Sequence, residues 1–284
     1  MTASRFAGGD QAYLRDEQYR DATRLTDRMR LHQRYSVART PWHEWVAARI
    51  DLHAGMHVLE VGCGSGALWE HGAAGLPADV ALTLCDLSPG MVDEALERAR
   101  ATGAYAVVDG RPADLQALPF ADHVYDRVVA NHMLYHLPDP RLGVAELARV
   151  VRPDGVVVAA TNGRRHMREL HEVEASVFGA DALDQTVDVF GAEVGFALLR
   201  ERFGDVRWHQ YEDQLRCTEP AHVLAYSCSS PPGEDATVGQ RAELEAAIAA
   251  RFDAGGGVMT ITKDSGCFVC RRPRRSRGEV RGAR

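Results

Sequence analysis

A short segment with one carboxylate and three glycines is the part of the sequence best suited to bind a small ligand. It reads Val-Leu-Glu-Val-Gly-Cys-Gly-Ser-Gly over residues 58–66. The apolar start predicts a strand that delivers Glu60 to its end, and the glycines let the backbone turn tightly and touch a ligand without Cβ clashes. The spacing is GxGxG, whereas the dinucleotide fingerprint is GxGxxG and receives a pyrophosphate. An acidic side chain here favours a cationic ligand, although a purely structural glycine turn is the alternative.

Two further carboxylates are expected at the same edge of the sheet. Asp86 ends the next apolar run, 20 residues after Gly66, where a carboxylate can accept both hydroxyls of a ribose. Asp114 follows the third run and can accept from an adenine amino group while Leu115 packs against the ring. The carboxyl ends of successive parallel strands converge on one crevice. The joint arrangement therefore favours a nucleoside ligand, although each acid alone is compatible with a structural role.

The elements that position these residues alternate between strand and helix. Predicted strands cover 57–62, 79–86, 104–110, 125–131 and 155–161, and predicted helices include 88–103, capped by Ser88, and 140–151. This alternation predicts parallel βαβ units and an α/β, doubly wound sheet covered on both faces.

The flanking segments have a less regular pattern. Residues 10–35 predict one or two amphipathic helices, and Thr40-Pro41-Trp42 predicts a helix with Thr40 as its N-cap. Later in the chain we expect helices at 164–179, 188–204, 220–229 and 237–252, an extended segment at 206–218, and a last strand near 258–272. The helical insertion around 164–185 follows the fifth strand, so we expect it to cover a substrate pocket.

Composition and charge exclude several classes of protein. The 284 residues are 45% hydrophobic and 26% charged, which is typical of a globular domain. The formal charge is −7, but residues 271–284 hold seven Arg and one Glu, a charge of +6, so residues 1–270 carry −13. Such an acidic body is a poor surface for nucleic acid. No apolar run is long enough for a membrane span or a signal peptide, so we expect a cytoplasmic protein without a membrane partner.

The six cysteines are scattered, which favours small buried side chains over disulfides. Cys267 and Cys270 have the CxxC spacing of redox and metal sites, but in a strand their thiols point to opposite faces. We therefore predict no metal site.

Four successive motifs resemble those of class I S-adenosylmethionine-dependent methyltransferases, closest to the ubiquinone/menaquinone-biosynthesis-like group that acts on small molecules. They are VLEVGCGSG, CDLSPGMVDEA, ADLQALPFADHVYDRVVANHMLYHLPD and ELARVVRPDGVVVAATNG, and the match covers about residues 40–163. The resemblance implies a Rossmann-like, seven-stranded sheet with an antiparallel last strand, S-adenosylmethionine as cofactor and S-adenosylhomocysteine as product. NHML at 131–134 replaces the N/D-P-P-Y/F tetrapeptide of adenine and glutamine methylation, which favours a small-molecule acceptor.

The resemblance also assigns cofactor-binding residues by position. Glu60 would lie near the methionine amino group, Asp86 would bind the ribose, and Asp114 and Leu115 would hold the edge of the adenine. The remaining positions are the cofactor turn (Gly62, Cys63, Gly64, Gly66), the adenine flanks (Leu87, Met91) and the contacts to the methionine moiety (Asn131, His132).

Methyl transfer is an in-line displacement, in which alignment of the acceptor can supply about 7–11 kcal/mol. A base is needed only if the acceptor must lose a proton. His132 and His136 are the predicted catalytic bases because they follow the fourth strand and imidazole titrates near neutral pH. A packing role is the alternative for both. Tyr19, His43, Tyr135 and His166 are weaker candidates.

Three segments are predicted. Residues 1–39 form a helical lid, with a packing helix or a homodimer contact as alternatives; residues 40–272 form the methyltransferase domain; residues 273–284 form a disordered Arg-rich tail. Deletion of residues 1–34 is expected to leave a folded protein with much weaker turnover. An oxygen, nitrogen or carbon acceptor stays open, and specialised metabolism is suggested by association. A non-catalytic S-adenosylmethionine-binding regulator and a nicotinamide-dependent oxidoreductase are the alternative functions, and the GxGxG spacing counts against the second.

Overall fold

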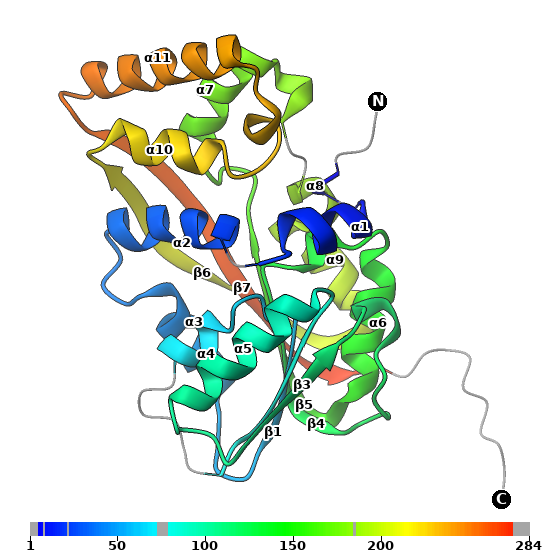
Figure 1. Cartoon of the computed structure of the whole chain (residues 1–284). Helices are drawn as coiled ribbons and strands as arrows, with labels where there is room; N and C mark the ends of the chain where they lie inside the picture. The colour runs from blue at the N-terminus through cyan, green and yellow to red at the C-terminus, as the bar shows by residue number, and fades with distance from the viewer. Residues whose placement is uncertain (1–4, 8, 22, 73–78, 184–185, 275–284) are drawn as a thin grey trace, which may run out of the picture.

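A seven-stranded sheet with helices on both faces forms the centre of the molecule (Figure 1). The computed structural model describes residues 5–7, 9–21, 23–72, 79–183 and 186–274. The strands are β1 (His57–Val61), β2 (Ala81–Asp86), β3 (Val107–Pro112), β4 (Tyr125–Asn131), β5 (Val151–Asn162), β6 (Phe203–Cys217) and β7 (Met259–Pro273). They lie in the order β3-β2-β1-β4-β5-β7-β6, and β7 is antiparallel to both of its neighbours while the other pairs are parallel. The predicted doubly wound sheet is confirmed.

Each face of the sheet has its own buried cluster. Helices α3 (Trp42–Ile50), α4 (Ala67–His71) and α5 (Pro89–Ala101) pack on one face, and α6 (Pro140–Val150), α8 (Thr186–Phe190) and α9 (Ala192–Arg202) pack on the other. Side chains alternate along a strand, so Val58 and Leu59 of β1 belong to different clusters. The same holds for Cys267 and Cys270, whose thiols face opposite sides of the sheet as predicted.

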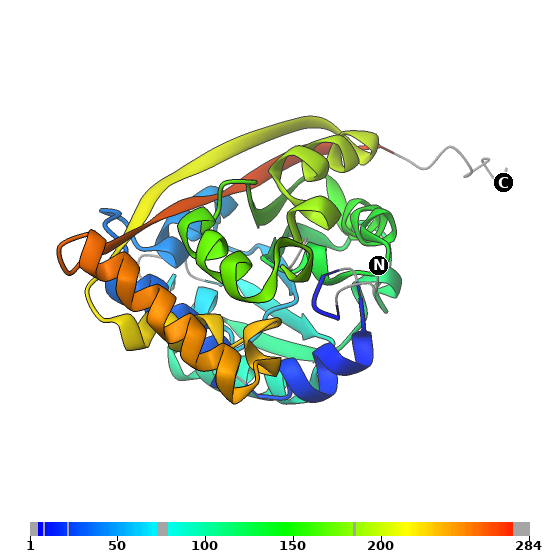
Figure 2. The same cartoon turned by 90° about the horizontal axis from the view of Figure 1, so that it is seen from above.

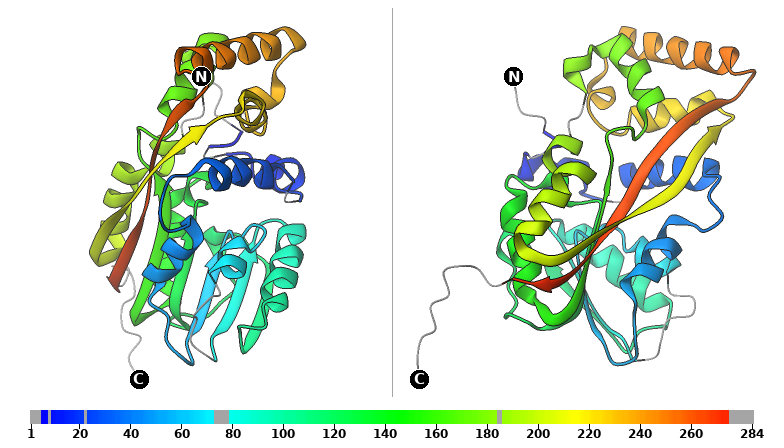
Figure 3. Two further views of the ribbon diagram at one scale, coloured as in Figure 1. Left: turned by 90° about the vertical axis from the view of Figure 1, so that its left-hand side faces the viewer. Right: turned by 180° about the vertical axis from the view of Figure 1, so that it is seen from behind.

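A third helical layer rests on the long ends of β6 and β7. Residues 259–264 of β7 pair with β6 but not with β5. Helices α7 (Arg168–Phe178), α10 (Pro220–Ser227) and α11 (Val238–Ala254) pack on this extension together with α2 (Thr23–Tyr35). Figures 1 and 3 show α2 between this layer and the carboxyl ends of the strands, and in Figure 2, seen from above, α11 partly covers α2. Helix α2 is preceded by α1 (Gln11–Tyr13) and a π-helical turn (Leu14–Gln18).

Local geometry corrects three expectations. The N-cap of α3 is Pro41 rather than Thr40, whose carbonyl oxygen accepts a hydrogen bond from Tyr211 Oη at 2.8 Å. The helix expected at 188–204 is divided at Gly191, where a Cβ atom would lie 2.5 Å from the carbonyl oxygen of Val187. Helix α7 begins only at Arg168, because its N-cap residue, Met167, has a left-handed backbone.

The N-terminal segment is not a separable unit. Leu31 and Tyr35 of α2 are buried against the helices of the third layer. A deletion of residues 1–34 would remove Leu31, so it would disrupt this core as well as remove the predicted lid. Residues 275–284 of the predicted Arg-rich tail lie outside the described residues.

Candidate active site

A cavity of about 860 Å³ lies beyond the carboxyl ends of β1, β2 and β4, with α2 along one wall. Its volume is in the range of small-molecule sites. Glu60, Asp86 and Asp114 all line it, so the fold brings the three carboxylates to one space. Phe6, Leu14 and Tyr19 of the N-terminal segment line it as well. The cavity therefore joins the edge of the sheet to the N-terminal segment.

The glycine turn keeps a backbone that other residues rarely adopt. Gly62, Gly64 and Gly66 have φ angles of 68°, 51° and 77°. A Cβ on Gly62 would lie 2.6 Å from Met133 Cγ, and one on Gly66 would lie 2.8 Å from the backbone of Ala95. Glycine is required by conformation and by space at both positions. Gly62 and Gly64 line the cavity together with Cys63, whereas Gly66 packs against α5 and does not line it.

Glu60 is a buried carboxylate at the end of β1. Only 1% of the residue is exposed, and its Oε2 accepts a hydrogen bond from Trp69 Nε1 at 2.6 Å. Burial raises the pKa of this carboxyl well above its usual range, and the charge of Asp86 raises it further. A cation bound beside Glu60 would relieve this unfavourable environment.

Asp86 is held by the backbone around it. Its Oδ2 accepts from the Gly64 N–H at 3.0 Å and its Oδ1 accepts from the Ser88 N–H at 3.0 Å. A carboxylate accepts about four hydrogen bonds, so about one position on each oxygen remains for a ligand. Burial raises the pKa of Asp86 as well.

The residues predicted around the adenine differ in their placement. Asp114 caps the short turn Leu115–Ala117 through the Gln116 N–H at 2.9 Å, and both Asp114 and Leu115 line the cavity. Leu87 lines it too. Met91 is a correction: it is fully buried in α5, it does not line the cavity, and its N–H bonds to Ser88 Oγ.

Asn131 ends β4 with an unsatisfied atom. Its Oδ1 is buried and has no hydrogen-bond partner among the described residues, although the side chain lines the cavity. Buried polar atoms without partners are costly, so this oxygen is available to a donor on a ligand.

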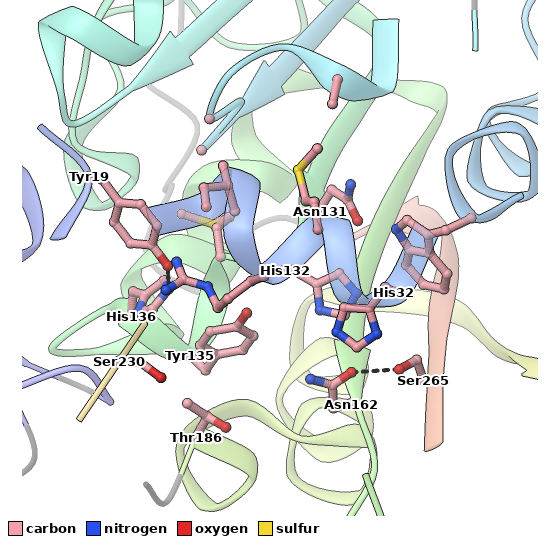
Figure 4. Close-up of a pocket in the computed structure, with 18 of the residues that line it drawn as sticks. Tyr19, His32, Asn131, His132, Tyr135, His136, Asn162, Thr186, Ser230 and Ser265 are labelled. Atoms are coloured by element: carbon pink, nitrogen blue, oxygen red, sulfur yellow. Dashed lines mark hydrogen bonds between the residues drawn. The ribbon is translucent and has the colours of Figure 1, made fainter. Parts of the chain in front are cut away.

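His136 does not have a nitrogen available for catalysis. Its Nδ1 lies 2.8 Å from the carbonyl oxygen of Phe6 and its Nε2 lies 3.0 Å from Tyr19 Oη (Figure 4). A carbonyl only accepts, so Nδ1 carries the proton and Nε2 accepts from the tyrosine. Burial lowers the pKa of His136 to about 4. The geometry favours the packing alternative, in which His136 anchors the N-terminal segment.

His132 keeps the position expected of it but in an unusual conformation. Its φ angle is 55°, and its ring centroid lies 5.0 Å from that of Trp42. Residues held in this region of φ cluster at functional sites. Burial lowers its pKa to about 3, so the imidazole is neutral near pH 7.

Asn162, His166 and Ser265 line the cavity and form a chain of hydrogen bonds. The sequence did not predict that they would meet. Ser265 Oγ donates to Asn162 Oδ1 at 2.7 Å (Figure 4). His166 Nδ1 lies 3.2 Å from the same hydroxyl. The hydroxyl has a single proton, so His166 Nδ1 must donate to it and His166 Nε2 is left as an acceptor. His166 lines the cavity. No pattern in the sequence of the last strand predicts that Ser265 contacts His166, which lies 99 residues earlier.

The described part of the chain has neither a metal-binding cluster nor a helix that could span a membrane. No group of three or more His, Cys, Asp or Glu side chains there is arranged to hold a metal ion. No described helix is both long and apolar enough to cross a membrane.

Part of the chain is similar in sequence to known methyltransferases. Residues 59–159 match the family model described as "Methyltransferase domain". The chain is 34% identical over 168 residues to a malonyl-[acyl-carrier protein] O-methyltransferase of Laribacter hongkongensis, covering 56% of this chain and 54% of that protein. It is 37% identical over 123 residues to a ubiquinone biosynthesis O-methyltransferase of Xanthomonas oryzae pv. oryzae, covering 43% of this chain and 48% of that protein. The chain thus spans about half the length of these curated relatives.

Solved structures share the fold. A putative methyltransferase from Bacillus halodurans has a TM-score of 0.58 at 16% identity and covers 82% of this chain and 99% of its own. The Haemonchus contortus phosphoethanolamine N-methyltransferase 2 in complex with S-adenosyl-L-methionine has a TM-score of 0.57 at 15% identity and covers 93% of this chain and 60% of its own. Residues 59–159 are therefore similar in sequence to a methyltransferase domain, and the fold of the chain is shared with solved methyltransferase structures.

Proposed function

We propose that this protein transfers a methyl group from S-adenosylmethionine to a small-molecule acceptor bound in the same cavity. The observation that carries the proposal is Glu60, a buried carboxylate that has no cationic partner among the described residues and lies at the cavity wall. Glu60 and the unsatisfied Asn131 Oδ1 suit the ammonium end of the cofactor, and Asp86 suits the ribose. These acidic and amide side chains suit S-adenosylmethionine because it is positively charged and has no phosphate.

The residues of this chain mainly orient the acceptor and exclude water. When bound, the cofactor supplies a methyl group that a positively charged sulfur has already activated. The N-terminal segment and α2 cover the cavity with Phe6, Leu14 and Tyr19, which would exclude water and hold the acceptor in line. We include in this proposal that residues 5–21 act as a lid.

His166 is our proposed base for an acceptor that must lose a proton. The chain of hydrogen bonds from Asn162 through Ser265 presents Nε2 as the acceptor nitrogen. Burial lowers the pKa of His166 well below its usual range, so the imidazole is neutral near pH 7 and Nε2 keeps its lone pair. His136 replaces it less well, because both of its nitrogens are already hydrogen-bonded. His132 remains the alternative base.

Calorimetry with S-adenosylhomocysteine and NAD tests the cofactor assignment. Asp86→Ala removes a carboxylate with about two free acceptor positions, and two charge-assisted bonds are worth about 3–6 kcal/mol. We expect at least about 100-fold weaker binding of S-adenosylhomocysteine. Asp93→Ala removes an exposed carboxylate from α5 and serves as the matched control. Binding of NAD in place of S-adenosylhomocysteine would refute the proposal.

Turnover separates an enzyme from a cofactor-binding regulator. Formation of S-adenosylhomocysteine is followed with a panel of phenols, amines and carboxylic acids. His166→Asn is expected to reduce turnover of a hydroxyl acceptor about 100-fold or more while cofactor binding is retained. Ser265→Ala should shift the pH profile of turnover, because it removes the group that orients the imidazole. A variant at His166 with wild-type turnover would exclude it as the base.

A further inference from the structure

Arg28 presents an unpaired guanidinium nitrogen inside the cavity. Its Nη1 donates to the carbonyl oxygen of Ser229 at 2.9 Å, but its Nη2 is buried and has no hydrogen-bond partner in the described part of the chain. The guanidinium carbon lies 5.7 Å from the ring centroid of Phe6 and 5.5 Å from that of Tyr19. Arginine cannot lose its proton in a protein, so Nη2 can only donate. The site is therefore incomplete without a hydrogen-bond acceptor beside Arg28.

Lys263 provides a second cation on the wall of the same cavity. It is the single lysine among 33 basic residues and is 8% exposed. Its Nζ lies 3.0 Å from Asp213 Oδ2 and 5.0 Å from the centroid of the Tyr211 ring. An ammonium has three N–H groups, and Asp213 occupies one of them.

The carboxylate of Asp213 is committed behind the cavity wall. It also accepts from Ser36 Oγ at 2.8 Å and from the backbone N–H groups of Val37 and Ala38 at 3.0 Å. Asp213 does not line the cavity, whereas Lys263 does. Lys263 is therefore on the cavity wall, whereas its counter-ion is not.

His32 lines the cavity together with Arg28 and Lys263. It lies one helical turn after Arg28 on α2, and its Nδ1 is also buried without a partner among the described residues. Burial lowers the pKa of His32, and the charge of Lys263 lowers it further.

The remaining walls of this region are aromatic and weakly acidic. Trp42, Tyr135 and Tyr226 line it together with Tyr19. Glu174 also lines it, but its Oε1 accepts from Ser227 Oγ at 2.6 Å and burial raises its pKa to about 7. Glu174 is thus only partly ionised at neutral pH and offsets little of the positive charge.

We propose that the methyl acceptor is an aromatic carboxylic acid whose carboxylate accepts from Arg28 Nη2 and is attracted by Lys263. The aromatic side chains contact the ring of the acid, and the carboxylate supplies the acceptor that Arg28 lacks. This inference rests on the proposed methyl transfer, because it assigns this half of the cavity to the acceptor.

The test compares an acid with its neutral counterpart. Full-length protein saturated with S-adenosylhomocysteine is titrated with 4-hydroxybenzoate, with 4-hydroxybenzamide and with phenyl phosphate. We expect the benzoate to bind about 10-fold or more tightly than the amide and the phosphate. In Arg28→Gln, binding of the benzoate should weaken about 10- to 100-fold, which is the effect of one charge-assisted hydrogen bond.

Two further variants keep the result interpretable. Arg34→Gln removes an exposed arginine from the same helix and should leave all affinities unchanged. Retained binding of S-adenosylhomocysteine shows that Arg28→Gln is folded; if it is lost, Arg28→Lys is measured instead and should retain the preference for the acid. Equal binding of benzoate and benzamide, stronger binding of phenyl phosphate, or no binding of the benzoate would overturn the inference. Absence of S-adenosylhomocysteine binding by the wild-type protein would instead refute the proposed function.

Discussion

The attachment of the N-terminal segment depends on Glu234, which follows α10 in the turn Gly233–Asp235. Tyr13 Oη donates to Glu234 Oε1 at 2.6 Å, and Arg24 Nη1 donates to Glu234 Oε2 at 2.7 Å. The Glu234 side chain is 9% exposed and that of Arg24 is 39% exposed. Burial raises the pKa of Tyr13, so its hydroxyl remains a donor at all ordinary pH values. Glu234→Ala removes the acceptor of both bonds.

The expected loss follows from the exposure of the two partners. The hydrogen bond from Tyr13 is partly buried and charge-assisted, which is worth about 1.5–3 kcal/mol. The pair with Arg24 is more than one-third exposed and adds about 0–1 kcal/mol. Gln18 Oε1 lies 3.1 Å from Tyr13 Oη and takes over part of the lost bond. We therefore expect about 2 kcal/mol, which increases the population of the open lid about 30-fold.

Hydrogen–deuterium exchange of the amides in residues 9–21 measures this population directly. Exchange there should accelerate about 30-fold in Glu234→Ala, while exchange in β1 and β4 stays unchanged. Dissociation of S-adenosylhomocysteine should accelerate in parallel, because the same residues cover the cavity. Glu245→Ala, an exposed carboxylate on α11, is the matched control.

A second perturbation avoids the core. Deletion of residues 1–21 removes the proposed lid and keeps α2 with its buried Leu31. Turnover should fall in this variant while the melting transition remains cooperative. If neither Glu234→Ala nor the deletion changes exchange, cofactor release or turnover, residues 5–21 are a packing segment and the lid is refuted.

Three further predictions follow from single residues. Gly62→Ala should lose about 1–3 kcal/mol of stability and most cofactor affinity, as measured by denaturation and calorimetry, because its φ is 68° and a Cβ would meet Met133 at 2.6 Å. The folded-state pKa of Glu174 is raised to about 7 from 4.5, so the folded state binds the extra proton and stability falls as pH rises from about 4.5 to 7. Glu174→Gln should therefore be about 2–3 kcal/mol more stable relative to wild type at pH 8 than at pH 4.5, and equal pH dependence of the two would contradict this. The pKa of His136 is lowered to about 4 from 6.5, so the wild type loses stability as pH falls between these values. His136→Phe should lack this loss in urea titrations, and its residues 9–21 should exchange faster at pH 7 because the bonds to Phe6 and Tyr19 are gone.

The sequence by itself determined the sheet and several of the polar residues that line the cavity at its edge. Alternating apolar runs and glycine turns are local signals, and the carboxyl ends of parallel strands meet wherever such a sheet forms. Glu60, Asp86 and Asn131 could therefore be named before the fold was known. The resemblance placed Met91 beside the adenine, but in this fold Met91 is on the buried side of α5 and does not line the cavity.

Only the tertiary structure decided which residues form the far wall of the cavity. Arg28, His166 and Lys263 come from three segments more than 90 residues apart, and they line one cavity because β6 and β7 extend past the sheet and carry a helical layer over it. No periodicity records which polar side chains will share a cavity, because side-chain partners across such distances depend on packing rather than on spacing. The same reason applies to His136. Its two nitrogens bond to the carbonyl of Phe6 and the hydroxyl of Tyr19, which lie 130 and 117 residues earlier in the chain.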